Sequence, residues 1–153
     1  MHSQNKIALL FSLLRLAIGA LFVYSGYTKL IAANSNFVGV VLSYQIVDVR
    51  MATWVAAILP WVEFIAGIFF ILGIWFQASL FTLWVLSAVF LTAIASTLLR
   101  HIPLKDCGCF GEGAHGIPVE ATLALDILLF FIFFWMYQKK EESGRFGLDR
   151  FLD

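Results

Sequence analysis

The chain has 153 residues, of which 61% are hydrophobic and 13% charged, and its mean hydropathy is +0.91. A soluble domain usually has about 45–50% apolar and about 25% charged residues, so this balance excludes an ordinary soluble domain. The formal net charge is zero, so no excess of basic residues indicates nucleic-acid binding. The composition predicts an integral membrane protein.

The predicted secondary structure is all-α, because each long apolar run suits a membrane-spanning helix. The first run covers residues 7–30 and reaches about 35 Å as a helix, enough for a hydrocarbon core of about 30 Å. The other three runs cover residues 52–76, 78–99 and 118–137. We therefore expect one domain over residues 1–153, built as a four-helix membrane bundle.

Two segments lie outside the predicted spans. Between the first and second spans, apolar residues recur at helical spacing, which favours a short interfacial helix over a plain loop; they are Phe37, Val40, Val41, Tyr44 and Val47. Residues 138–153 form a charged tail. With four spans the termini share one side, and a slight excess of lysine and arginine there predicts that both termini are cytoplasmic.

Four ionisable residues fall within or at the end of the spans, where charge is costly and often functional: Arg15, Lys29, Glu63 and Asp126. In the first span Arg15, Gly19, Phe22, Gly26 and Lys29 share one stripe, and its two glycines favour close approach of a neighbouring helix. If the first two spans are antiparallel, Arg15 and Glu63 lie at similar depth and are expected to pair.

Such a pair would either fix helix register or take part in redox or proton-relay chemistry. Asp126 has no cation beside it in the fourth span. It could be a protonated acid, a second partner of Arg15, or a proton acceptor for thiol chemistry, and the sequence leaves these alternatives open.

Both cysteines of the chain, Cys107 and Cys109, lie in the polar loop before the fourth span, predicted to be extracytoplasmic. Gly108 between them can take the positive φ that a sharp turn needs. A bridge across so short a ring gains little loop-closure entropy, and strained exposed disulfides exchange readily. The pattern therefore favours a redox pair, with the neighbouring residues Asp106, Phe110 and Gly111 supporting the loop.

The alternative chemistry is metal binding. Cys107 and Cys109 with His101 and His115 would form a soft S₂N₂ set suited to zinc or copper, although the cysteine spacing departs from common zinc sites. Inert surface thiols are a further reading. No metal or organic cofactor is required by the sequence.

The motifs "RLAIGALFVYSGYTKL", "LPWVEFIAGIFFILG" and "CGCFG" together resemble the methylamine-utilisation MauE family, within the DoxX-like four-helix membrane proteins. The resemblance implies a multi-pass protein of the bacterial inner membrane that acts with a thioredoxin-fold partner in forming disulfides of an exported protein. It places the redox pair at Cys107 and Cys109, and makes a quinone a possible electron acceptor. A non-redox assembly subunit is the remaining alternative.

Overall fold

The computed structural model describes residues 2–31, 34–102 and 119–139, and every regular element in these ranges is a helix. The helices are α1 (His2–Ile31), α2 (Asn34–Ser43), α3 (Val49–Leu72), α4 (Phe76–Leu99) and α5 (Val119–Gln138). The predicted all-α class is confirmed.

Among the described helices, α1, α3, α4 and α5 are long and apolar enough to cross a bilayer. Their apolar spans hold 23, 24, 24 and 20 residues, which at about 1.5 Å per residue gives about 30–36 Å. Large apolar side chains point away from the bundle, such as Trp54 at 66% and Phe131 at 62% exposure. This surface suits lipid, and the protein is a multi-pass membrane protein.

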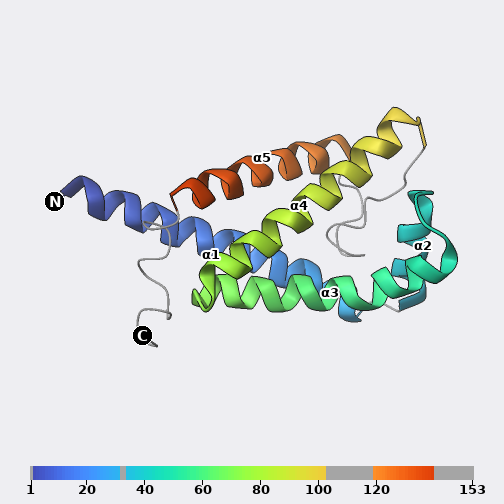
Figure 1. The fold of residues 1–153 in the computed structure, drawn as a ribbon, viewed down its shortest axis with the longest axis horizontal. Coiled ribbons are helices and arrows are strands. Elements are labelled where there is room, and N and C mark those ends of the chain that lie inside the picture. The colour runs from blue at the N-terminus through green and yellow to red at the C-terminus, as the bar shows by residue number, and fades with distance from the viewer. Residues whose placement is uncertain (1, 32–33, 103–118, 140–153) are drawn as a thin grey trace.

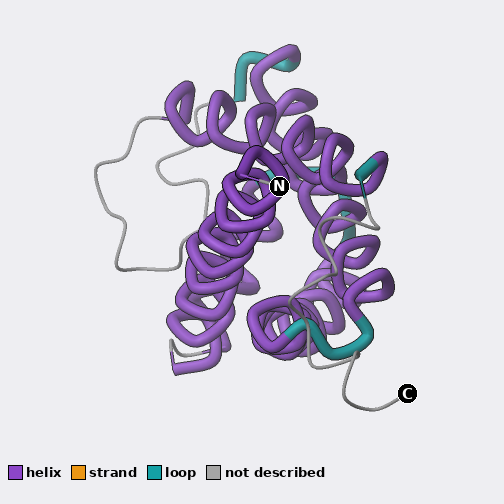
Figure 2. Tube along the Cα trace, turned by 90° about the vertical axis from the view of Figure 1, so that its left-hand side faces the viewer, coloured by secondary structure: helices purple, strands orange, loops and turns teal. Residues whose placement is uncertain are grey.

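The helices run alternately along the molecule (Figure 1). The beginning of α1 and the end of α5 lie at one end, whereas α2, the end of α4 and the beginning of α5 lie at the other. Viewed along the bundle, these helices surround a common interior (Figure 2). The single segment between Ile102 and Val119 therefore connects two helices at the end where α2 lies.

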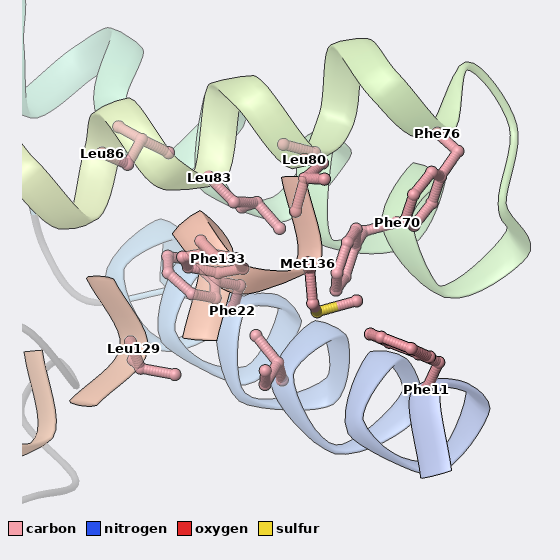
Figure 3. Packing of buried hydrophobic residues seen from close by; sticks show 12 residues of the cluster. Phe11, Phe22, Phe70, Phe76, Leu80, Leu83, Leu86, Leu129, Phe133 and Met136 are labelled. Carbon is pink, nitrogen blue, oxygen red and sulfur yellow. The ribbon is translucent and has the colours of Figure 1, made fainter. Parts of the chain in front are cut away.

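Aromatic rings fill much of this interior. Phe70 of α3 lies 5.6 Å from Phe76 and 6.0 Å from Phe133 of α5, measured between ring centroids. Phe22 of α1 lies 5.9 Å from the same Phe133 (Figure 3). Each ring buries a large apolar area, so this cluster holds α1, α3, α4 and α5 together.

The connection between α3 and α4 begins earlier than the sequence predicts. The second span was expected to continue to Phe76, but α3 ends at Leu72. Gly73 takes the left-handed conformation, with φ 67°, and its N–H donates to the carbonyl of Phe69. Trp75 is also left-handed, with φ 47°, so the chain reverses within three residues.

The short helix between the first two spans is confirmed as α2, but it ends at Ser43. Tyr44 and Val47, which were predicted to belong to this helix, therefore lie after its end, in the link to α3. Asp48 ends this link as the N-cap of α3, where its Oδ1 accepts a hydrogen bond from the backbone N–H of Met51 at 3.0 Å.

Candidate functional site

The most completely built polar site among the described residues joins Lys29 of α1 to Glu63 of α3. The Lys29 ammonium donates to Oε1 of Glu63 at 2.8 Å and to Oε2 at 2.7 Å. Lys29 is 1% exposed and Glu63 is fully buried. A buried pair this close is a charge-assisted contact that binds the two helices at one register.

Ser25 completes the coordination of this pair. Its Oγ accepts a hydrogen bond from Lys29 Nζ at 3.0 Å and donates one to Glu63 Oε2 at 3.1 Å. An ammonium has three N–H donors, and the two carboxylate oxygens and the serine hydroxyl receive all three. Ser25 stands one helical turn before Lys29, and lysine side chains on a helix lean toward its N-terminus.

Two aromatic rings enclose the ammonium from other helices. The centroid of Phe37 on α2 lies 5.5 Å from Lys29 Nζ, and that of Phe90 on α4 lies 5.0 Å away. Both distances fit cation–π attraction, which strengthens when the cation is removed from water. The short helix therefore contributes one wall of the ion-pair site.

Glycines allow α1 and α3 to approach closely enough for these contacts. A Cβ on Gly26 would lie 2.7 Å from the backbone N of Phe64 and 2.8 Å from the carbonyl oxygen of Pro60. Two turns earlier on α1, a Cβ on Gly19 would lie 2.4 Å from the side chain of Ile71 and 3.2 Å from the carbonyl oxygen of Gly67. The predicted close packing along this glycine stripe is confirmed.

The expected pair between Arg15 and Glu63 is wrong. Glu63 binds Lys29 and Ser25, and Ser25 lies ten residues, or about 15 Å, beyond Arg15 along α1. Arg15 is buried, at 7% exposure, near the opposite end of the bundle. The error lies in the assumed depth, because the axial offset between α1 and α3 is set by the contact of Gly26 with Pro60 and Phe64.

Asp126 lies on α5 and is 5% exposed. Its backbone carbonyl accepts a hydrogen bond from the buried Ser87 hydroxyl of α4 at 3.3 Å. Ser87 precedes Phe90 by three residues, so Asp126 lies at a depth similar to that of the Lys29–Glu63 pair. The three alternative roles of Asp126 (protonated acid, second partner of Arg15, or proton acceptor for thiol chemistry) stay predictions.

The predicted redox loop lies outside the described residues; it comprises Asp106, Cys107, Gly108, Cys109, Phe110 and Gly111. His115, one ligand of the alternative metal set, also lies outside them. His101, the other proposed metal ligand, is exposed just after α4 with φ 52°. Within the part of the chain that the structure describes, His, Cys, Asp and Glu form no group of three suited to a metal.

Next to His101, Arg100 ties the end of α4 to the link after α2. Its guanidinium donates to the carbonyl oxygens of Tyr44 and Gln45, the second at 3.2 Å. The helix that leads into the cysteine loop is thus fastened to the segment that follows α2. Sequence reasoning missed this contact because nothing in the pattern relates residues 55 positions apart.

Ser25 and Phe90 are the other contributors that sequence reasoning missed. The four-residue step from Ser25 to Lys29 was an available signal, since such a serine lies within reach of the lysine stem. No sequence signal distinguishes Phe90, because it is one of 16 phenylalanines in an apolar chain.

Residues 7–138 match the family described as methylamine utilisation protein MauE. The chain belongs to the MauE family. The match includes the four apolar helices, the Lys29–Glu63 site and both cysteines. No curated protein and no solved structure matches the chain at a significant level.

Proposed function

We propose that this MauE-family membrane protein is a thiol–disulfide exchanger that uses Cys107 and Cys109 with a thioredoxin-fold partner on the outer side of the cell membrane. The observation that carries the proposal is the Cys-Gly-Cys spacing, which lies inside the family match. Two thiols separated by one glycine suit reversible exchange better than structural bridging.

The exchange moves two electrons. A thiolate of the partner attacks one sulfur of the Cys107–Cys109 disulfide, forming a mixed disulfide and releasing the other sulfur as a thiolate. The partner's second thiolate then attacks the mixed disulfide, so the partner leaves oxidised and the pair is left reduced. A lipid-soluble quinone or a second disulfide carrier must then accept two electrons and two protons to restore the pair.

Within this proposal the Lys29–Glu63 site has a structural role. It fixes α1 against α3 and brings Phe37 of α2 onto the ammonium, while Arg100 links the following segment to α4. These contacts hold the bundle end from which the chain continues after Ile102. A rigid support is what a loop that must meet a partner in one orientation requires.

The test uses the fact that the chain has only two cysteines. Cells are quenched with acid and labelled with a large maleimide before and after reduction, so that the mass shift counts free thiols. The proposal expects labelling only after reduction. A single Cys107→Ser or Cys109→Ser variant cannot form the internal disulfide, so its remaining thiol should label without reduction and the partner should stay reduced.

Free thiols of the parent protein in untreated cells, or full oxidation of the partner in both serine variants, would contradict the exchange mechanism. Stoichiometric zinc or copper in the purified protein, lost in both serine variants, would then favour the metal-binding alternative. A membrane-impermeant maleimide applied to pre-reduced living cells tests the orientation, and the proposed outward loop requires labelling under these conditions.

A further inference from the structure

An apolar hollow of about 180 Å³ lies between α2, α3 and α4, beside the ion-pair site. Its walls come from the short helix and the link after it, from the first half of α3 and from the second half of α4. Phe37 and Phe90, the two rings that enclose the Lys29 ammonium, both line it. A molecule bound in the hollow would therefore pack against both of the rings that contact the Lys29 ammonium.

The hollow opens where a bilayer would surround the molecule. Three of its lining residues are apolar and partly exposed: Ile46 at 52%, Val55 at 36% and Val89 at 51%. Val55 and Val89 belong to membrane-spanning helices, so this opening faces hydrocarbon. Water gains nothing in so apolar a space, because it needs two to four polar partners.

The chemistry of the lining favours a hydrocarbon chain over a ring that carries carbonyl groups. The walls are almost wholly apolar, and the Lys29 donors are already used by Glu63 and Ser25. A quinone head group buried here would lose its hydrogen bonds to water without replacement. A dry cavity of about 150 Å³ with similar walls accommodates benzene, so about six carbons of a chain fit here.

A cationic side chain contacts one of the residues that line the hollow. Tyr44 lines it, and the guanidinium of Arg100 is held against the carbonyl oxygens of Tyr44 and Gln45. Arg100 is exposed at the end of α4, where a membrane-spanning helix leaves the hydrocarbon. Arginine has five N–H donors, and the carbonyls of Tyr44 and Gln45 take two of them, so the others can donate to phosphate oxygens.

We propose that this hollow is a phospholipid-binding site, in which one acyl chain lies between α2, α3 and α4 and the lipid phosphate lies beside Arg100. The bound chain packs against Phe37 and Phe90 and so keeps α2 on the buried ion pair. The lipid is a structural ligand, and its binding does not depend on the proposed thiol exchange.

The test is photo-crosslinking in vesicles of phosphatidylethanolamine and phosphatidylglycerol. The full chain is reconstituted with a small fraction of phosphatidylglycerol bearing a diazirine on one acyl chain, and adducts are mapped by mass spectrometry. We expect adducts concentrated on the residues of the hollow. Ala93→Phe, which fills the hollow, should lower their yield about tenfold, which corresponds to a loss of about 1.4 kcal/mol of binding free energy.

Ala78→Phe is the matched control, because Ala78 lines a second apolar hollow between α3 and α4 that Ala93 does not reach. It should leave the adduct yield unchanged. Val89→Phe provides a second blocking variant, since this half-exposed position admits a larger ring even if Ala93→Phe unfolds the protein. Adducts spread evenly over the lipid-facing surface, or unaffected by both blocking variants, would overturn the proposal.

The phosphate contact has its own comparison. A diacylglycerol with the same photoactivatable chain but no phosphate should label the hollow less than the phospholipid does, and Arg100→Gln should remove the difference. Equal labelling by the two probes in the parent protein would refute the Arg100 contact. Displacement of the phospholipid adducts by an equimolar amount of isoprenoid quinone would overturn the acyl-chain assignment in favour of a quinone.

Discussion

Lys29 and Glu63 meet in the interior of the bundle through two hydrogen bonds, although they lie 34 residues apart on different helices. Neither side chain is exposed, and Ser25 takes the remaining donor of the ammonium. Both charges have left water, so each depends on the other to offset its desolvation. The site is therefore stable only as a unit.

The first prediction concerns this mutual dependence. Lys29→Met or Glu63→Leu alone leaves one uncompensated buried charge, and each should lower the free energy of unfolding by about 3–5 kcal/mol. The double variant removes both charges and keeps apolar bulk, so it should regain most of the loss. Thermal unfolding in detergent, compared across the four proteins, measures the coupling. A double variant with the summed loss of the single variants would show that the two residues act independently.

Ser25 tests whether the third hydrogen bond matters. Ser25→Ala leaves one buried N–H of Lys29 without an acceptor, and we expect a loss of about 1–3 kcal/mol. Ser43→Ala is the matched control, because the hydroxyl of Ser43 is exposed and bonds only to the carbonyl of Val40. Its effect should stay within about 0.5 kcal/mol. Equal unfolding midpoints for the two variants would show that the hydrogen bonds of Ser25 do not stabilise the site.

The close approach of α1 and α3 gives a third prediction. Gly26→Ala places a methyl group against backbone atoms of Pro60 and Phe64, which cannot rotate away, so the helices must separate at the ion pair. We expect a loss of about 1–3 kcal/mol, the usual cost of overpacking. Gly39→Ala on α2 meets no atom within 4 Å and should be neutral or stabilising by about 0.5–1 kcal/mol. Gly26→Ala as stable as the parent protein would contradict the observed packing.

Sequence periodicity predicted the helices and the packing stripe, because both follow from local spacing. Apolar length placed the four spans, and the recurrence of Gly19 and Gly26 identified the face of α1 that meets α3. The boundary at Leu72 was missed, because the apolar run continues through Gly73 and only the left-handed turn there ends the helix.

The partner of Glu63 could not be read from periodicity. Arg15 and Lys29 lie on the same stripe of α1, so spacing alone makes either a suitable partner. The choice depends on how far α3 slides along α1, which Gly26 and Pro60 determine through their backbone contact. Residues from α2 and α4 enter the site only through the tertiary fold, and no local pattern relates them to Lys29.

The last prediction tests the aromatic enclosure of the ammonium. Phe90→Leu keeps an apolar side chain of similar reach but removes the ring whose centroid lies 5.0 Å from Lys29 Nζ. Loss of a desolvated cation–π contact should cost about 2 kcal/mol, in addition to a small packing change. Phe131→Leu makes the same exchange on the lipid-facing side of α5 and is the control for ring loss alone.

The two variants should be compared with Lys29 present and in the Lys29→Met, Glu63→Leu background. Because the cation is gone in that background, the extra cost of Phe90→Leu over Phe131→Leu should largely disappear; a cost that persists would assign the effect to packing instead of the charge.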